Sequence, residues 1–419
     1  MSTTSLEARN IAAGEHKANP HPFYARLRAE HPVFPMTLPD KRTIWLVTRY
    51  DDVATVLKDE RFIKNLTNAP RNKTSQQPWI PRFAQPLTRH MLNTDKPDHP
   101  RLRGLVNKAF SPRLVEQIGD RIQALSVEIL DRLSGRKQID LIRDYALPIP
   151  TTIIAEMLGV PARDQKKFNR WSNAIIELFS TRWGMLTAVP QIWKFIRYIR
   201  RYVRLRQRDP RDDLVSELVK ADVDGEQLTE DELVAMVFLL LVAGHETTVN
   251  LIGNGVLALL EHPEQMELLR DAPQRIELAV EELLRYGSPV EMATERYTLT
   301  DVTIAGMTIP AGSLVGAVIA SANRDHRHFT DPDTLVLMRD PNKHLSFGLG
   351  AHYCTGAALA RLEAQITVNT LLQTLPRFTL LQEVGELRWR PGLVTRGLAA
   401  LPISIEQWAS PSAAMVPRS

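Results

Sequence analysis

The sequence predicts a mainly α-helical protein with a small β region, folded as one domain over residues 1–419. Helical periodicity of apolar residues dominates the chain, and short strand-like stretches with turn signals gather toward its two ends. No internal repeat or low-complexity linker marks a domain boundary, although this length allows two or three domains. We expect the polar, proline-bearing residues 410–419 to form a frayed tail.

Amphipathic periodicity of the apolar residues predicts eight helices. They cover His21–Glu30, Asp51–Lys58, Leu114–Ser134, Tyr145–Leu158, Arg163–Phe179, Gln191–Arg208, Asp212–Ala221 and Pro263–Asp271. Strands are predicted for Thr43–Thr48, Tyr297–Ile304, Ser313–Ile319, Phe378–Leu381 and Ala399–Ile405. The stretch Lys64–Leu92 is polar and lacks periodicity, and loops of this length are usually functional or disordered.

Composition limits the classes of function. Hydrophobic residues make up 44% and charged residues 24% of the chain, an ordinary globular balance, and a net charge of +4 does not suggest a nucleic-acid partner. The N-terminus lacks the pattern of a signal peptide, and the apolar run Leu233–Ala243 is shorter than the ~20 residues that span a bilayer. The single cysteine cannot form an intrachain disulfide. We therefore expect a cytoplasmic protein without a membrane anchor.

The strongest chemical signal is Phe-Gly-Leu-Gly-Ala-His-Tyr-Cys-Thr-Gly at residues 347–356. Its two closely spaced glycines allow a tight turn and a close approach to a flat ligand. Cys354 follows them, and the helix predicted over Ala357–Leu372 places its N-terminus near the sulfur, which favours the thiolate. The alternative is a glycine-rich turn with a buried structural cysteine.

This loop resembles the haem-binding loop of the cytochrome P450 family, Phe-Gly-x-Gly-x-His-x-Cys-x-Gly. The resemblance implies the fold of that family, a haem b cofactor, and Cys354 as the axial ligand of its iron. In such proteins the cysteine thiolate favours O–O cleavage. The other loop residues that the resemblance assigns to the cofactor are Phe347, Gly348, Gly350, His352 and Gly356.

A long helix is predicted from the capping box at Thr229–Glu232 to about Leu260, roughly 30 residues or ~45 Å. Residues 243–248 in its middle read Ala-Gly-His-Glu-Thr-Thr, and a glycine, an acid and hydroxyls cost stability in an apolar helix. Read alone, they indicate either a kink or a site. By resemblance, Glu246 relays protons, Thr247 positions the water that delivers them, and Ala243 and Gly244 leave room beside the cofactor. His245 receives no catalytic role.

The family also has a buried Glu-x-x-Arg pair, which Glu282 and Arg285 match. Its usual third member is an arginine, here Arg339, whereas Thr334 stands where many relatives have a further arginine. By the same resemblance, four residues anchor the haem propionates, because buried carboxylates need cationic or hydrogen-bonding partners. They are His99, Arg103, Arg296 and His352.

The substrate side is less specific. By resemblance, the pocket is lined by Leu240, Ala243, Val290, Thr294 and Val394, which suit an apolar ligand but would equally suit core packing. The stretch Lys194–Arg208 holds seven basic residues and no acid, most simply as a solvated helix face. The alternative is a surface that captures an anionic or carrier-tethered substrate.

The resemblance implies a monooxygenase that uses dioxygen and two external electrons to hydroxylate or epoxidise an apolar small molecule. No reductase domain fits in the chain, so a ferredoxin or flavodoxin with its NAD(P)H-dependent reductase should supply electrons. Arg324, His326 and Arg361 are candidates for a basic docking patch. A peroxide-using or oxidative-coupling enzyme and a non-catalytic haem sensor remain as alternatives.

Overall fold

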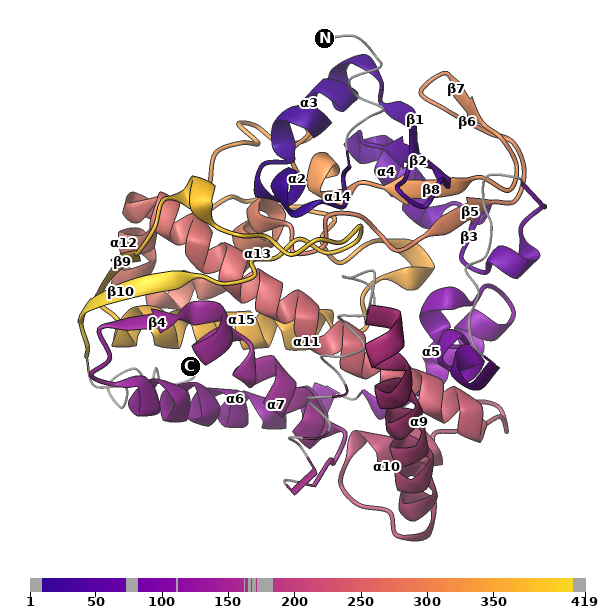
Figure 1. Cartoon of the computed structure of the whole chain (residues 1–419), viewed down its shortest axis with the longest axis horizontal. Helices are drawn as coiled ribbons and strands as arrows, with labels where there is room; N and C mark the ends of the chain where they lie inside the picture. Colours follow the sequence, from indigo (N-terminus) through magenta and orange to yellow (C-terminus); the bar gives the residue numbers. More distant parts are fainter. Residues whose placement is uncertain are drawn as a thin grey trace. The chain divides into compact units, whose positions relative to one another are not determined.

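The computed structural model describes residues 10–72, 82–110, 112–161, 163–164, 167, 171 and 184–409 (Figure 1). The chain divides into two compact units. Unit 1 comprises residues 1–77, 123–146 and 247–419, and unit 2 comprises residues 78–122 and 147–246. The boundary falls inside helix α11 (Glu230–Glu261), between Glu246 and Thr247. The single-domain organisation stays a prediction, and the predicted tail lies outside the described residues.

Unit 1 contains a five-stranded sheet in the order β1-β2-β8-β5-β3. Its strands are β1 (Val33–Thr37), β2 (Thr43–Val47), β3 (Phe62–Ile63), β5 (Arg296–Thr298) and β8 (Leu314–Ala317). β2 and β8 are parallel, with Leu46 opposite Gly316, and the other pairs are antiparallel. The sheet therefore joins segments from the start and the last third of the chain.

Both faces of this sheet carry buried side chains. Because successive side chains of a strand point to opposite sides, neighbouring residues enter different core clusters. Leu46 belongs to a core cluster with Leu27 of α3 (His21–Glu30). Its neighbour Val47 belongs to a second cluster with Val53 of α4 (Tyr50–Lys58). This explains why β2 reads as a continuous apolar run rather than an alternating one.

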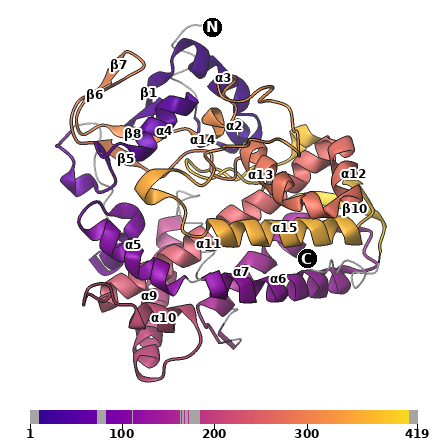
Figure 2. The same ribbon diagram turned by 180° about the vertical axis from the view of Figure 1, so that it is seen from behind.

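The rest of unit 1 consists of two smaller sheets and several helices. The sheets are β4 (Gln138–Asp140), β10 (Pro402–Gln407) and β9 (Arg377–Leu380), and the hairpin of β6 (Val302–Ile304) and β7 (Met307–Ile309). The helices are α2 (Gly14–Ala18), α12 (Pro263–Asp271), α13 (Ile276–Gly287), α14 (Ile319–Ala322) and α15 (Ala357–Thr374), together with a π-helical turn at Ile142–Ala146. α13 packs against α15 (Figure 2). Short 3₁₀ turns lie at Leu66–Asn68, Pro273–Arg275, Gly350–His352 and Val384–Glu386.

Unit 2 is helical in its described part. It contains α5 (Asp98–Ala109), α7 (Pro148–Met157), α9 (Gly184–Arg208), α10 (Leu214–Lys220) and the first half of α11, with 3₁₀ turns at Arg82–Thr88 and Met91–Asn93. α6 (Pro112–Leu133) contributes residues to both units. A buried ion pair joins α9 to α10, since Arg206 Nε lies 2.5 Å from Asp213 Oδ2. Asp213 also caps α10 by accepting from the Ser216 amide at 2.8 Å.

The capping box that predicted the start of α11 is confirmed. The Thr229 amide donates to Glu232 Oε2 at 2.8 Å, and the Glu232 amide donates to Thr229 Oγ1 at 3.3 Å. α11 is also the one helix in the described ranges that is long and apolar enough to cross a membrane, and 61% of its most apolar window is buried inside the protein. Such burial is ordinary for a core helix.

Most predicted elements are present, and the differences have local reasons. The bounds predicted for α3 and α12 match. α5 is not predicted, because its charged sequence and Pro100 hide the apolar face. The strand predicted to Ile319 ends at Ala317, and Ile319 begins α14. The helix predicted over Arg163–Phe179 lies largely outside the described residues, as does part of the stretch Lys64–Leu92.

Candidate functional site

The cysteine loop of unit 1 closes around two glycines and leaves Cys354 exposed. Gly348 and Gly350 have φ of 71° and 70°, which L side chains rarely adopt, so both positions require glycine. The Cys354 amide donates to the carbonyl of Phe347 at 2.9 Å, which closes the loop two residues before Gly356, the N-cap of α15. Cys354 is exposed, although cysteine is among the most buried residue types. A loop that fixes and exposes its only thiol fits a residue that binds a ligand.

A charged side chain braces this loop from α15. The guanidinium of Arg361 lies 4.4 Å from the centroid of the Phe347 ring. It donates to both oxygens of Glu281 in α13, at 2.7 and 2.8 Å. Burial alone would raise the pKa of Glu281, but hydrogen bonds from Arg361 and His344 lower that pKa to about 2. The pair therefore stays ionised and ties the loop to α13.

The structure corrects one member of the predicted docking patch, Arg324. Arg361 is paired with Glu281, so its charge is largely neutralised. Arg324 is 5% exposed, lies 3.8 Å from the Tyr286 ring centroid and is paired with Asp333 at 3.0 Å. The prediction is wrong for Arg324, whose side chain is buried. Arg361 is 30% exposed, and its place in a docking patch stays a prediction. His326 is exposed, and its role stays a prediction.

The predicted Glu-x-x-Arg pair is a buried hub. Glu282 and Arg285 have fully buried side chains and are joined by two hydrogen bonds of 2.7 and 2.8 Å. Arg339 is confirmed as the third member, since its Nε lies 3.2 Å from both carboxylate oxygens of Glu282. The backbone carbonyl of Thr334 accepts from Arg285 at 3.1 Å, a contact that does not depend on the side chain at that position. Asn342, which sequence reasoning missed, also donates to Glu282 at 3.0 Å.

The polar segment of α11 is less buried than the helix around it. Ala243 is exposed, whereas Gly244, Glu246 and Thr247 are partly exposed. His245 is buried, with its Nδ1 2.7 Å from the Leu241 carbonyl. A short polar and accessible stretch within an apolar helix fits a binding surface better than simple core packing.

Two residues of this polar segment, Gly244 and Thr248, also contact neighbouring helices. A Cβ at Gly244 would lie 3.4 Å from Ile154 Cδ1 in unit 2, so the glycine also serves helix packing. In unit 1, the carboxyl of Glu363 in α15 is hydrogen-bonded to Thr248 and only 1% exposed. Burial raises the pKa of Glu363 to about 8. Sequence reasoning missed this acid, although its buried neighbours Leu359 and Thr367, four residues away on each side, show that it shares their face.

The predicted propionate partners occur in both units. In unit 1, Arg296 is buried in β5, and His352 is partly exposed at the end of its 3₁₀ turn. In unit 2, His99 and Arg103 lie four residues apart on α5, which places them on one face. Burial, followed by the charge of Arg103, lowers the pKa of His99. A neutral His99 can still donate a hydrogen bond to a carboxylate.

The predicted substrate residues of unit 1 lie in two segments, 290–294 and 394–395, which are joined by backbone hydrogen bonds. Val290 forms a β-bridge with Thr395, and the Val394 carbonyl accepts from the amide of Glu291 at 2.8 Å. The buried side chain of Lys64 holds Thr294, at the end of the segment 290–294. Lys64 Nζ donates to Thr294 Oγ1 at 2.6 Å and to the Thr294 carbonyl at 3.0 Å. Lys64 was missed, since 230 residues separate it from Thr294 in the sequence. In unit 2, Leu240 is buried.

Glu291 anchors the start of the same segment. Its carboxylate lies 2.9 Å from Lys17 Nζ and accepts from the Tyr24 hydroxyl at 2.5 Å. The side chains of Lys17 and Glu291 are 0% and 1% exposed. Buried charges at both ends of a segment hold its backbone in one position, as a binding surface requires.

The residues of unit 1 fit a haem with a thiolate ligand. An exposed thiol lies on a closed glycine loop, and the unit also carries a buried arginine, Arg296, at a position predicted for a propionate. A loop held by Arg361 and by two left-handed glycines leaves the sulfur little freedom. These features match a cofactor that takes one protein ligand on its metal and ionic partners at its edge.

Comparison with known proteins agrees with this assignment. A family model described as cytochrome P450 matches residues 8–277 and 274–388. Vitamin D(3) 25-hydroxylase of Pseudonocardia autotrophica is 40% identical over 407 residues, which cover 97% of this chain and 98% of that protein.

Two solved structures are also similar. The cytochrome P450 PksS of the Bacillus subtilis bacillaene polyketide synthase has a TM-score of 0.89 and 38% identity, covering 95% of this chain and all of that one. P450BioI in complex with an acyl carrier protein ligated to hexadec-9Z-enoic acid has a TM-score of 0.85 and 40% identity, covering 94% and 100%. The mainly helical fold with small sheets is therefore the fold of this family, and the chain belongs to the cytochrome P450 family as a P450 monooxygenase.

Proposed function

We propose that the protein uses haem b, dioxygen and two external electrons to hydroxylate or epoxidise an apolar small molecule. The observation that carries the proposal is the exposed thiol of Cys354 in a rigid loop at the N-terminus of α15. When bound, the haem supplies the oxygen-activating chemistry, and the thiolate favours O–O cleavage. The protein supplies binding, orientation and protons.

Each part of the loop and its surroundings has a proposed role toward the haem. Cys354 is the ligand of the iron, and Gly348, Gly350 and Gly356 allow the backbone to approach the ring. The Phe347 ring, which contacts the Arg361 guanidinium, is proposed to pack beside the sulfur. Arg296 and His352 of unit 1, and His99 and Arg103 of unit 2, bind the propionates through charge-assisted hydrogen bonds.

The acid and hydroxyl of α11 move protons. Glu246 takes a proton from solvent, for which its partial exposure is suitable. Thr247 holds the water that passes the proton on, and Ala243 and Gly244 provide the adjacent surface. General acid–base groups of this kind contribute typically ~10²–10⁴ in rate.

The substrate is an apolar molecule of the secondary-metabolite, terpenoid, steroid or fatty-acid type. Relatives named for polyketide biosynthesis, for hydroxylation and epoxidation of mycinamicin IV and for vitamin D(3) 25-hydroxylation support this range. Leu240, Ala243, Val290, Thr294 and Val394 are proposed to contact it. The P450BioI complex supports a substrate held on a carrier protein.

Electrons come from a ferredoxin or flavodoxin with its NAD(P)H-dependent reductase, and the protein works in the cytoplasm. The alternative is a peroxide-using or oxidative-coupling enzyme on the same scaffold. The Glu246–Thr247 pair favours dioxygen, because peroxide already carries the protons that such a relay delivers.

A spectral titration tests the proposal. The ferric protein is titrated with a panel of macrolides, terpenoids, steroids and fatty acids, and the absorption of the haem is followed. We expect one class to shift the iron toward high spin and to yield an oxygenated product with surrogate ferredoxin, reductase and NADH. Product formation with hydrogen peroxide alone, and none with the reductase system, would favour the peroxide-using alternative.

A further inference from the structure

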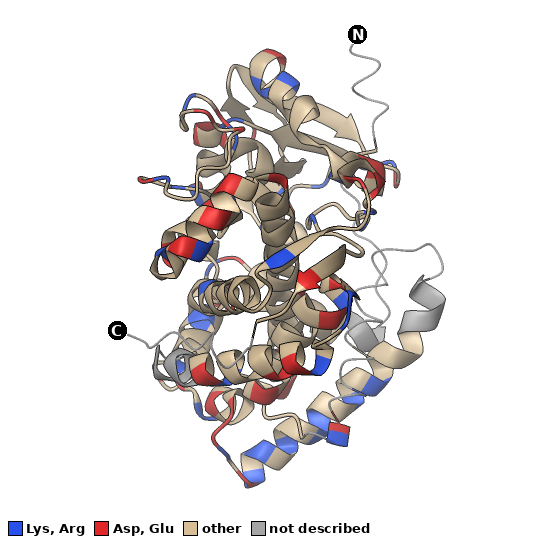
Figure 3. Cartoon of the chain, turned by 90° about the vertical axis from the view of Figure 1, so that its left-hand side faces the viewer, with Lys and Arg blue, Asp and Glu red and all other residues tan. Residues whose placement is uncertain are grey.

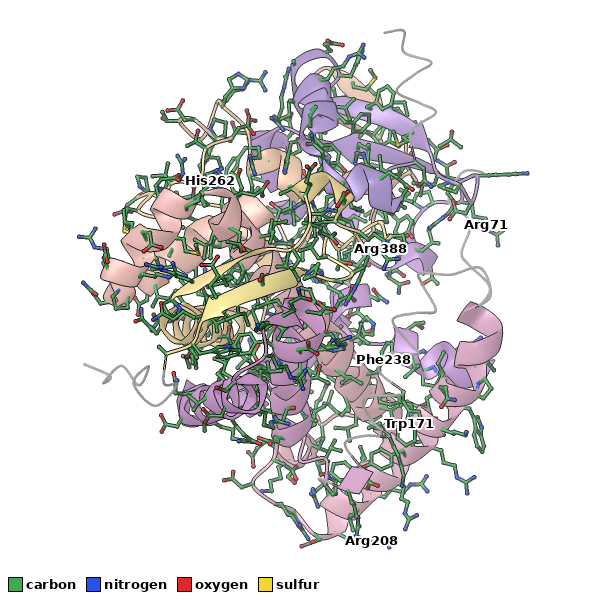
Figure 4. The ribbon with its side chains drawn as sticks, turned by 60° about the vertical axis from the view of Figure 1, so that its left-hand side comes forward. Arg71, Trp171, Arg208, Phe238, His262 and Arg388 are labelled. Atoms are coloured by element: carbon green, nitrogen blue, oxygen red, sulfur yellow. The ribbon has the colours of Figure 1, made fainter. Side chains whose placement is uncertain are left out.

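One face of α9 carries a row of arginines. Arg197, Arg201, Arg204 and Arg208 follow one another at intervals of four, three and four residues, so they share one side of the helix. The first and last are 11 residues apart, or ~16 Å along the axis. Figure 3 shows the basic residues of α9 in blue, and Figure 4 shows Arg208 at the end of the helix.

This row lies beside a groove within unit 2. A cavity of about 810 Å³ is lined by five arginines of α9 and by Trp193, Ile196, Leu205 and Pro86. In the described part of the chain, its lining contains no acidic residue. The groove therefore combines positive charge with apolar surface.

Internal ion pairs neutralise only part of this charge. Arg200 donates to Asp231 at 2.7 Å, and Arg204 donates to Glu230 at 3.0 Å. In contrast, Arg197, Arg201 and Arg208 are exposed and have no carboxylate partner among the residues that the structure describes. Three cations thus remain available along the groove.

Two large apolar side chains are exposed in the same groove. Trp193 and Leu205 are each 49% exposed, and the Arg197 guanidinium lies 5.4 Å from the Trp193 ring centroid. Tryptophan and arginine are the residue types most enriched at the energetic centres of protein interfaces. This composition is typical of a docking surface rather than of a merely solvated helix.

We propose that the groove docks an acidic helix of a carrier protein that delivers the substrate as a covalent acyl thioester. An acidic helix laid along α9 can place carboxylates one turn apart opposite Arg197, Arg201 and Arg208, while an apolar side chain contacts Trp193 or Leu205. The proposal deepens the function given above and rests on it, because the carrier presents an apolar acyl chain for oxidation.

The shape of the surface argues against a lipid bilayer as the partner. A helix that lies in a membrane inserts its apolar face. The apolar face of α9 already packs inside unit 2, where Phe195, Ile199 and Val203 are buried. A concave groove also matches a convex helix better than a flat membrane.

The test is a binding measurement on the full-length, haem-loaded protein. The probe is a purified acidic acyl carrier protein loaded with a hexadecanoyl chain, titrated by calorimetry at low and high salt. The variant is R197E/R201E/R208E, and the matched control is R275E/R377E/R388E, whose arginines are exposed in unit 1. Both triple variants change the net charge by −6, from +4 to −2, so only the position of the charges differs.

We expect the wild type and the control to bind the loaded carrier equally. The α9 variant should bind at least about tenfold more weakly at low salt, since removing three charge pairs costs on the order of 1.4 kcal/mol or more. Equal binding by both variants, or no binding by the wild type, would overturn the proposal. Tighter binding to anionic phospholipid vesicles than to the carrier would also overturn it.

A further arm separates this inference from the proposed function. Free hexadecanoic acid is titrated into the same proteins, and the spin state of the haem is followed. If free acid and other apolar ligands shift the spectrum while the carrier does not bind, the docking proposal fails and the monooxygenase proposal stands. If no ligand shifts the spectrum and no product forms, the proposed function itself fails.

Discussion

The buried acid Glu363 makes stability depend on pH in a direction that can be measured. Its carboxyl is 1% exposed, it is hydrogen-bonded to Thr248, and its Oε2 has no partner in the described part of the chain. Burial raises its pKa from 4.5 to about 8. The folded protein therefore retains a proton that the unfolded chain releases. The contribution of Glu363 to the free energy of unfolding is complete below pH ~4.5 and is lost as the pH rises toward 8.

The magnitude follows from the shift. Each pKa unit is worth ~1.4 kcal/mol, so a shift from 4.5 to about 8 corresponds to at most ~5 kcal/mol. Glu363→Gln keeps the shape and the hydrogen bond to Thr248 but cannot ionise. The variant should match the wild type near pH 5 and exceed it by ~4 kcal/mol above pH 8.

The assay is the melting temperature of the haem-loaded wild type and variant between pH 5 and 8.5. With an unfolding entropy of ~0.9 kcal/mol/K for a chain of this length, the gap should open to ~4–5 °C at high pH. Glu383→Gln, a change at an exposed acid, serves as the control and should leave the pH profile unchanged. A difference between Glu363→Gln and the wild type that does not vary with pH would refute the reasoning.

Three further predictions concern the fold and the site. Glu282→Gln leaves the buried guanidinium of Arg285 and the partly exposed one of Arg339 without their carboxylate, so urea denaturation should show a loss of ~3–5 kcal/mol in the free energy of unfolding. A loss below ~1 kcal/mol would contradict a structural role for this cluster. Thr247→Ala should leave haem content unchanged but divert electrons into peroxide, measured as product formed per NADH; unchanged coupling would remove Thr247 from the proton path. Lys64→Met frees Thr294, so substrate affinity in the spectral titration should fall several-fold while haem content is retained. Unaltered affinity would show that this segment does not shape the pocket.

The parts of the fold that sequence predicted well depend on local signals. The cysteine loop was identifiable because Gly348 and Gly350 occupy left-handed positions that other residues rarely adopt. The start of α11 was identifiable because its capping box is a contact between residues three apart. The Glu282–Arg285 pair lies within one helical turn, so its spacing was visible, and the family resemblance indicated its burial.

What sequence missed depends on contacts between distant segments. Arg324 was predicted on the surface, but Tyr286 and Asp333 bury and pair its charge. Lys64 holds Thr294 across 230 residues, a contact that no local pattern encodes. α5 was missed because its apolar residues are few, and its contact with α10 joins segments that are distant in the sequence.

The most direct test of the whole account is the haem spectrum of the wild type beside that of Cys354→His. The wild type should bind one haem per chain, and its reduced carbon monoxide complex should show the red-shifted Soret band of thiolate ligation. The variant, whose imidazole can also bind iron, should retain haem but lose that band. Persistence of the thiolate band in Cys354→His, or a wild type that binds no haem, would contradict the assignment of Cys354 as the iron ligand.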